Sequence, residues 1–334
     1  MAAPVFAVLG CLTLDSVVTA SGDRFASVCG GNALYAAAGM AIWERRVGIV
    51  TRAGSDYPED CLQPFEDAGI ALSGVHPRLD QPGLHVAFAY RRDGSRTHGL
   101  APEVLAAIPA EERSVFVDDT HEEDRYLAFT PRPSDIPAPW MADLSGAHLP
   151  QLRWESQASL ARALRESRPD LRITLDAWHV AAGQEPADGL LEDVDAFLPS
   201  EDDARRLRPD RSAPEAARDF QALGARHVVI KLGDAGCLVR TAEGATWHIP
   251  AYPAAAIDPT GAGDAFCGGF LVGLHETGDP VQAAAFGTIS ASFVVEQPTA
   301  ASVLVVERSA AIARRVDLMG RIRQVSSGGH GVRR

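Results

Sequence analysis

The chain has 334 residues, 46% of them hydrophobic, and a formal net charge of −13. This length and composition suit one large α/β domain or two small ones around a buried core. The charge argues against sequence-independent binding to nucleic acid, which needs a basic surface. No apolar run approaches the roughly 20 residues that span a bilayer, and residues 1–15 lack the basic start of a signal peptide. We therefore expect a cytoplasmic protein without membrane contact.

The N-terminal part predicts a strand, a polar loop and a helix. Residues 5–9 form an apolar run typical of a buried strand, and Asp15 follows just beyond it. Ligands of open α/β sheets bind at this end of the strands, although a lone Asp in a loop is more often a turn former. Gly30, Gly31 and Asn32 then begin an alanine-rich helix. They suit a polyol held close to the backbone, and a simple helix start explains them equally well.

The middle of the chain predicts another strand, a hairpin and a segment without clear structure. Residues 47–51 and 84–91 have the composition of strands, and R-D-G-S at 92–95 is a strong turn signal. The arginines of this hairpin are more often solvated than bound to an anionic substrate; they are Arg91, Arg92 and Arg96. Residues 118–139 combine an acidic patch and His121 with several prolines, which a solvated loop explains better than a metal site.

The second half alternates helices and strands. A helix is expected over 153–167 and strands over 171–175, 196–198 and 227–232. Such alternation builds right-handed βαβ units and a mainly parallel sheet with helices on both faces. A capped helix start explains residues 200–203, and a last core helix is expected from Asp279 to about residue 294.

Two residue types have informative distributions. The five cysteines are scattered without a C-x-x-C pair, at Cys11, Cys29, Cys61, Cys237 and Cys267. This pattern predicts reduced, mostly buried thiols rather than disulfides or a zinc site. Among the 31 basic residues only Lys231 is a lysine. At the end of a strand, before the G-D-A-G turn at 233–236, it either neutralises an anion or extends to water.

Residues 257–270, I-D-P-T-G-A-G-D-A-F-C-G-G-F, are the most informative stretch. A turn of small and helix-breaking residues leads into an apolar helix, and the free N–H groups and dipole of such a helix start attract a phosphate. Asp264 would then accept a proton from an attacking hydroxyl. A plain turn with a capping Asp explains the residues equally well. A Rossmann fingerprint is excluded because Phe266 replaces its third glycine, and the chain has no Walker A G-K-S/T.

The string D-P-T-G-A-G-D-A-F closely resembles the C-terminal signature of the ribokinase (PfkB) family of sugar and nucleoside kinases, and G-G-N-A at 30–33 resembles the N-terminal motif of that family. The resemblance implies a three-layer α/β/α ribokinase-like domain over 1–325, with a small β-sheet lid from about 12–28 and 84–100. It also implies transfer of the γ-phosphate of ATP, with Mg²⁺, to a hydroxymethyl group of a sugar or sugar-like substrate. The glycine-rich tail at 326–334 is expected to be disordered.

The resemblance also assigns roles to single residues. Asp264 becomes the catalytic base beside an anion hole formed by Gly261, Ala262 and Gly263. Substrate hydroxyls are assigned to Asp15, Gly30, Gly31 and Asn32. ATP is assigned to Lys231, Gly233, Gly236 and Thr260.

Two metal assignments follow from imperfect matches. Ser200 and Asp203 replace the Asn and Glu of the family's N-x-x-E motif, so Asp203 would organise Mg²⁺ through water. Asp258 and Thr260 match the first half of a monovalent-cation site for potassium. Its second half lacks the glycine, because residues 299–300 are Thr-Ala. Glu59 likewise replaces the last glycine of a G-x-D-x-x-G motif.

Two other functions stay open. A nucleoside kinase of the adenosine type would share every motif above. A non-catalytic sugar-binding or regulatory protein could use the same fold, and the changes at Glu59, Ser200 and Asp203 favour it. The intact Asp264 with its glycines opposes it, because a pure binder needs no base at an anion hole. A homodimer formed through the lid is expected from the resemblance alone.

Overall fold

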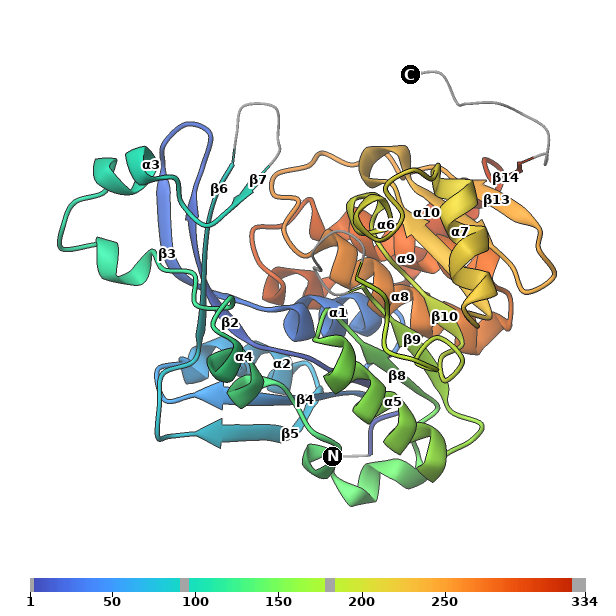
Figure 1. Ribbon diagram of the computed structural model, residues 1–334, viewed down its shortest axis with the longest axis horizontal. Helices are drawn as coiled ribbons and strands as arrows, with labels where there is room; N and C mark the ends of the chain where they lie inside the picture. Colours follow the sequence, from blue (N-terminus) through green and yellow to red (C-terminus); the bar gives the residue numbers. More distant parts are fainter. Residues whose placement is uncertain (1–2, 91–95, 178–183, 326–334) are drawn as a thin grey trace.

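The computed structural model describes residues 3–90, 96–177 and 184–325, which form two β-sheets flanked by helices (Figure 1). The large sheet has the strand order β14-β13-β12-β11-β10-β9-β8-β1-β4-β5. From β5 to β11 in this order neighbouring strands are parallel, and β12 to β14 are antiparallel. The mainly parallel sheet is therefore confirmed. Its strands are β1 (Phe6–Leu9), β4 (Val47–Gly54), β5 (Ala71–Arg78), β8 (Gly146–Leu149), β9 (Arg172–Leu175), β10 (Ala196–Phe197), β11 (His227–Lys231), β12 (Cys237–Arg240), β13 (Thr246–Ile249) and β14 (Arg323–Gln324).

Both faces of this sheet are covered. Successive side chains of a strand point to opposite sides, so each strand contributes to a core on either face. On β1, Phe6 and Val8 join one hydrophobic core, while Ala7 and Leu9 join the other. The first core lies under α1, α8 and α9, and the second under α5, α6 and α7. The three-layer α/β/α arrangement is thus confirmed. The helices are α1 (Asn32–Ala41), α2 (Gln63–Asp67), α3 (Pro102–Ala107), α4 (Glu123–Phe129), α5 (Trp154–Ser167), α6 (Glu201–Leu207), α7 (Ala213–Ala222), α8 (Ala262–Thr277), α9 (Pro280–Val294) and α10 (Arg308–Met319).

The second sheet is the expected lid. It has the order β3-β2-β6-β7 and lies at one end of the molecule in Figure 1. Its strands are β2 (Thr13–Val18), β3 (Arg24–Gly30), β6 (Leu84–Tyr90) and β7 (Arg96–His98). The pairing of β2 with β6 is parallel, and the other two pairings are antiparallel. The predicted turn at 92–95 lies outside the described residues, as does the tail at 326–334.

The lid carries a cover that the sequence did not predict. Ala87 and Ala89 of β6 pack with Val18, Ile108 and Phe116 in a small separate core. The segment from α3 to residue 116 supplies this cover, and Figure 1 shows α3 outside the lid strands. One face of the lid is therefore occupied by the chain itself.

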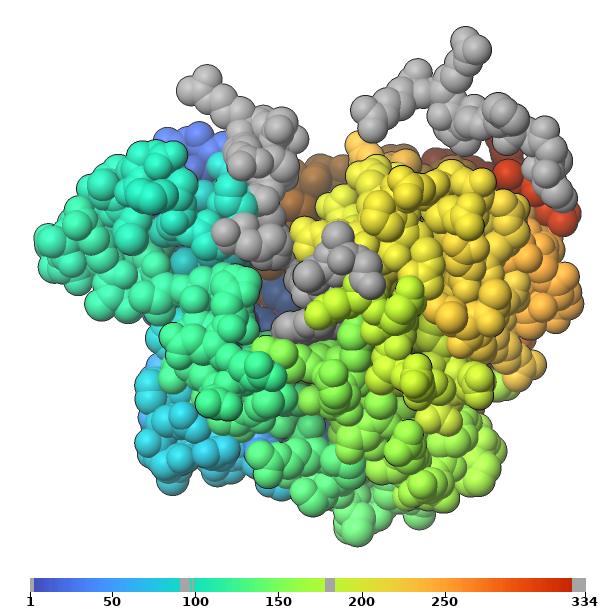
Figure 2. All heavy atoms as spheres, viewed as in Figure 1, coloured from blue at the N-terminus to red at the C-terminus, as the bar shows by residue number. Residues whose placement is uncertain are grey.

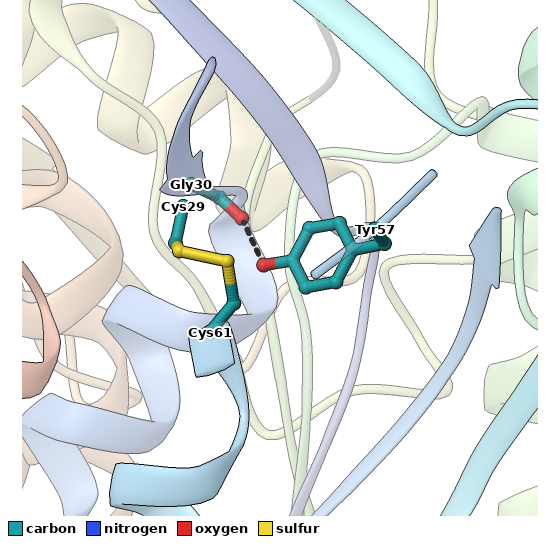
Figure 3. The surroundings of a disulfide bond; sticks show 4 residues. All are labelled: Cys29, Gly30, Tyr57 and Cys61. Carbon is teal, nitrogen blue, oxygen red and sulfur yellow. Dashed lines mark hydrogen bonds between the residues drawn. A yellow bond between two sulfur atoms is a disulfide. The ribbon is translucent and has the colours of Figure 1, made fainter. Parts of the chain in front are cut away.

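The prediction of five reduced cysteines is wrong for two of them. Cys29 and Cys61 form a disulfide, with Cα atoms 5.5 Å apart (Figure 3). Cys29 is near the end of β3, and Cys61 ends the 3₁₀ helix Glu59–Cys61 behind β4. The hydroxyl of Tyr57 donates a hydrogen bond to the carbonyl oxygen of Gly30 beside this bridge. The two cysteines are far apart in the sequence, so their spacing did not indicate a pair. They meet because the end of β3 leads from the lid back to the body of the protein.

The segment at 118–139 is only in part the solvated loop that was expected, because residues 121–124 are exposed but the rest is folded against the protein. It contains α4 and two 3₁₀ helices, Pro133–Asp135 and Ala138–Ala142. Asp135 is buried and pairs with Arg52 of β4, with a 2.8 Å contact between Nε and Oδ2. The helix α10 is a further unpredicted element. Within the described ranges, no helix has both the length and the apolar character needed to cross a membrane.

Candidate active site

A pocket of about 230 Å³ lies between the lid and the start of α8. Figure 2 shows this face of the molecule hollowed between the lid segments and the body. The pocket walls come from β2, β6, α1, α8 and the segment that precedes α4. Its lining residues are Cys11, Thr13, Asp15, Gly31, Asn32, Tyr35, Val86, Phe88, Asp118, Thr120, His121, Tyr126, Gln151, Thr260, Gly261 and Asp264.

The glycine turn forms the N-terminus of α8. Gly261 is the N-cap with φ 73°, and Asp264 lies in the first turn. A side chain at Gly261 would overlap the ring of Tyr35, so both the backbone angle and the space require glycine. The first N–H groups of a helix lack intrahelical acceptors, and the helix dipole makes this end electropositive. Gly261 and Asp264 line the pocket, which gives this turn the properties of an anion site with a carboxylate beside it.

Asp15 lies on β2 and is 8% exposed. The hydroxyl of Thr13 donates to its Oδ1 at 2.6 Å, which fixes the carboxylate at the pocket wall. A Cβ atom on Gly30 would overlap the Asp15 carboxylate, so this close approach needs glycine. A carboxylate held in this way accepts hydrogen bonds from the hydroxyls of a ligand.

Asn32 is the first residue of α1 and also lines the pocket. Its Oδ1 accepts from the Cys11 N–H at 2.9 Å, and its Nδ2 donates to the Gln151 carbonyl at 3.0 Å. Tyr126 donates to the same carbonyl at 3.0 Å. Asn32 therefore joins three separate segments at the pocket wall. Gly31 precedes it as the N-cap.

Tyr90 connects the lid to the glycine turn. Its hydroxyl lies 2.9 Å from Oδ1 of Asp258 and 2.5 Å from the hydroxyl of Thr260. The Thr260 N–H also donates to Oδ1 of Asp258 at 2.8 Å. Two donors thus already satisfy this carboxylate oxygen. The arrangement does not fit a potassium ion on that oxygen, and we derive no step through potassium.

Tyr35 of α1 lies close to three acids, Asp15, Asp258 and Asp264. Burial raises the pKa of its phenol, and the negative charges of Asp15, Asp258 and Asp264 raise it further. The phenol is therefore neutral and available as a hydrogen-bond donor at physiological pH. The same electrostatic effects place all three carboxylates around one side chain of α1.

Lys231, at the end of β11, forms a buried ion pair that the sequence did not reveal. Its Nζ donates to Oδ2 of Asp176 at 2.6 Å, and the Cys267 sulfur lies 3.4 Å away. A Cβ atom built on Gly263 would lie 3.6 Å from Nζ, so the ammonium also faces the glycine turn. Burial alone would lower the pKa of Lys231, but Asp176, Cys267 and Asp264 outweigh it and raise the pKa.

Like Lys231, the predicted residues Gly233, Gly236 and Asp203 are not among those that line the pocket. Gly233 and Gly236 flank the turn between β11 and β12. Asp203 is buried in α6, where its Oδ2 accepts from the N–H and hydroxyl of Ser200 in a capping box. The helix cap thus accounts for this oxygen, and the described residues contain no group of three potential metal ligands. The assignment of Asp203 to Mg²⁺ through water stays a prediction.

Several pocket residues were missed from the sequence. Asp118, Thr120 and His121 line the pocket although their segment was expected to be solvated. Asp118 accepts from the hydroxyl of Thr120 at 2.6 Å, and the His121 ring lies 3.6 Å from its other oxygen. The neighbouring Asp119 accepts from the His85 N–H of β6 at 2.9 Å, which attaches the segment to the lid. No local sequence signal identifies such a long-range attachment.

Comparison with known proteins identifies the family. The model of the pfkB family of carbohydrate kinases matches residues 7–306. The chain belongs to this family. A pfkB kinase transfers phosphate to an alcohol group, so the protein is a phosphotransferase with an alcohol acceptor.

Individual relatives of this pfkB kinase differ in substrate. The cytidine kinase of Thermococcus kodakarensis is 28% identical over 281 residues, which cover 82% of this chain and 90% of that protein. The structure of Arabidopsis thaliana ribokinase with ribose and ATP has a TM-score of 0.69 at 19% identity, covering 94% of this chain and 99% of its own. A Burkholderia thailandensis nucleoside kinase in complex with inosine has a TM-score of 0.68 at 16% identity, with the same coverage. These two structures establish the fold alone.

Proposed function

We propose that this pfkB kinase transfers the γ-phosphate of ATP to a hydroxymethyl group of a sugar or sugar-like substrate, with Asp264 as general base. One observation carries the proposal. Asp264 and Gly261 at the start of α8 share a pocket with Asp15 and Asn32, so a base, an anion turn and polyol-binding groups meet in one place. A protein that only binds sugar has no use for the first two.

The chemistry needs one proton transfer and one displacement. Asp264 accepts the proton of the acceptor hydroxyl, the hydroxyl oxygen forms a bond to the γ-phosphorus, and the bond from phosphorus to the ADP oxygen breaks. A positioned base contributes about 10²–10⁴-fold in rate. N–H groups of Gly261, Ala262 and Gly263 would stabilise the transferred charge, at about 3 kcal/mol for each donor. The Ala262 N–H donates to the Pro259 carbonyl at 3.2 Å in this structure, so it would exchange that acceptor for the phosphate.

The nucleotide is assigned to the region where β11 meets α8. Lys231 supplies a positive charge next to Gly263, and the turn from Gly233 to Gly236 follows the same strand, while Thr260 lies in the turn before α8. Mg²⁺ carried by the nucleotide supplies charge neutralisation when it is bound. We assign Mg²⁺ no direct ligand in the chain, because Oδ2 of Asp203 already accepts a hydrogen bond from Ser200 in the helix cap.

The lid excludes water from the reaction. The Tyr90 hydroxyl of β6 contacts Asp258 and Thr260, so the lid and the glycine turn are joined in the described conformation. Water excluded in this way cannot compete with the acceptor for the phosphate. The cytoplasmic location stays a prediction from the sequence.

A nucleoside is the second candidate for the acceptor. The observation that favours it is the similarity to a cytidine kinase over 90% of that protein's length. The pocket adds Phe88 from the lid and Tyr126 from α4, two aromatic side chains of the kind that contact a nucleobase. Asp15 would bind the ribose hydroxyls in the same way as those of a free sugar.

The test is ADP release from ATP and Mg²⁺ with a panel of ketoses, aldoses, sugar acids and nucleosides. We expect release to depend on one class of acceptor and to be lost in the Asp264→Asn variant, which should still bind that acceptor. Asp210→Asn, at an exposed acid between α6 and α7, is the matched control for an acid-to-amide change. Full activity of Asp264→Asn would refute the assignment of the base. Binding without turnover across the panel would support the non-catalytic alternative.

A further inference from the structure

An acidic residue with no role in the proposed reaction lies beside the glycine turn. Asp176 follows β9, and its side chain is 1% exposed, while that of its partner Lys231 is 11% exposed. The Ala177 N–H donates to Oδ1 of Asp176 at 2.8 Å, which leaves Oδ2 directed at the ammonium at 2.6 Å. The carboxylate is therefore oriented by its own backbone and points at the only lysine of the chain.

The ammonium faces the place where phosphate is expected. Its Nζ lies 3.6 Å from a Cβ atom built on Gly263, in the middle of the anion turn. A phosphoryl oxygen bound to the N–H groups of this turn would lie within reach of Nζ. A compact charge in a site of low dielectric stabilises a transferring phosphoryl group far more than it would in water.

A lysine in this position needs a counter-charge to stay protonated. Burial favours the neutral amine, and an amine without charge does not stabilise phosphate. The other titratable groups that face the pair are Cys267 and Asp264 of α8, His148 of β8 and Asp203 of α6. His148 is neutral because burial lowers its pKa to about 3, so it adds no positive charge. Burial raises the pKa of Asp176, and its 2.6 Å contact with the ammonium opposes that shift and favours the charged pair.

We propose that Asp176 is a positioning residue for phosphoryl transfer, which keeps the Lys231 ammonium charged and aimed at the turn from Gly261 to Gly263. This inference rests on the proposed kinase function. Asp176 touches neither substrate in this account and acts only through Lys231. A purely structural ion pair would stabilise the fold without changing how the reaction depends on pH.

The single lysine permits a direct measurement without mutation. Protein labelled with ¹⁵N or ¹³C at the lysine side chain gives one signal, which belongs to Lys231. We expect this signal to report a charged ammonium up to a pH above about 10.4, the usual lysine pKa, and to shift when β,γ-methylene ATP and Mg²⁺ are added. If the protein binds the nucleotide and the Lys231 signal does not shift, the proposal is overturned.

Kinetics of Asp176→Asn then test the role of the carboxylate. We expect kcat to fall at least about tenfold at neutral pH, and the alkaline loss of activity to move at least about one pH unit lower, because the ammonium loses its counter-charge. Lys231→Met should lose about 10²–10³-fold, and adding Asp176→Asn to it should cause no further loss. Asp170→Asn, an exposed acid just before β9, is the matched control and should behave as wild type.

The outcomes separate the two proposals. If the wild-type protein releases no ADP with any acceptor, the kinase function fails before Asp176 is tested. If the wild type is active and Asp176→Asn keeps its kcat and pH profile, only the role of Asp176 is refuted. Additive losses in the double variant would also refute it. If Asp176→Asn does not fold, the lysine signal of the wild-type protein still decides.

Discussion

Gly261 illustrates how one residue determines both the backbone and the chemistry of this site. Its φ of 73° belongs to the left-handed region, and the Tyr35 ring occupies the space of a side chain. Gly278 at the other end of α8 has a similar φ of 67°, but nothing lies within 4 Å of the position of its Cβ. Substitutions at the two glycines therefore allow the effect of backbone strain to be distinguished from damage to the site.

We predict that Gly261→Ala loses most phosphoryl transfer, because the turn must move away from Tyr35. Gly278→Ala should lose only about 1–2 kcal/mol of unfolding free energy from the strained φ and keep its activity. ADP release and chemical denaturation of both variants check this. Equal activity of the two variants would contradict the role of the turn as an anion hole.

The burial of His148 in β8 predicts that the free energy of unfolding depends on pH. The residue is fully buried, its Nδ1 lies 2.9 Å from the Thr174 hydroxyl, and burial lowers its pKa from 6.5 to about 3. The unfolded chain therefore binds a proton below about pH 6.5 that the folded chain does not, so stability falls as the pH falls through this window.

The expected loss from this histidine is about 1.4 kcal/mol between about pH 7.5 and pH 5.5. Chemical denaturation at the two pH values, compared between wild type and His148→Gln, isolates this contribution. The glutamine variant should lose about 1.4 kcal/mol less than wild type over the same interval. Equal losses in both proteins would show that His148 is protonated in the folded state.

At the scale of elements, the disulfide joins the end of the lid strand β3 to the 3₁₀ helix that follows β4 in the sequence. It connects positions 32 residues apart, and Gly30, which packs against the Asp15 carboxylate, directly follows one of its cysteines. A cross-link of this length stabilises a protein by about 3–4 kcal/mol in the chain-entropy model. The bridge therefore contributes a large part of the stability that a single domain commonly has.

We predict that Cys29→Ser with Cys61→Ser lowers the unfolding free energy by about 3–4 kcal/mol, as measured by denaturation without reductant. Reductant should lower the stability of the wild type by a similar amount and leave the double variant unchanged. A wild-type protein that is equally stable with and without reductant would contradict the pairing.

At the scale of the whole molecule, the cover on the lid bears on oligomeric state. The resemblance to sugar kinases implied a homodimer through the lid. Here the chain's own α3 and residues up to 116 pack on one face of the lid, and Arg24 of β3 pairs with Glu112 at 3.1 Å. A face that is already covered cannot also bury itself against a second copy.

We therefore expect a monomer of 35.5 kDa in solution. Light scattering coupled to size exclusion measures this mass directly. A species of twice that mass would mean that another surface, such as the exposed β3 edge with Phe25, forms a dimer.

The sequence predicted those features that depend on neighbouring residues. The turn before Asp264, the helix start at Asn32 and the alternation of strands and helices are local patterns, and the structure has them. The contact of Lys231 with Asp176 spans 55 residues, and that of Tyr90 with Asp258 spans 168. Pairs of this kind depend on the folded topology, so no spacing in the sequence indicates them. The disulfide and the cover of the lid were missed for the same reason.

The most direct test of the account is ³¹P NMR of the reaction product. The proposal requires the γ-phosphate to be attached to a CH₂ carbon, so the new phosphomonoester signal should be a triplet from coupling to two protons. Asp264→Asn should form none of it. A doublet, from phosphate on a secondary alcohol, would contradict the hydroxymethyl acceptor. Release of inorganic phosphate alone, with no phosphorylated acceptor, would contradict the kinase mechanism itself.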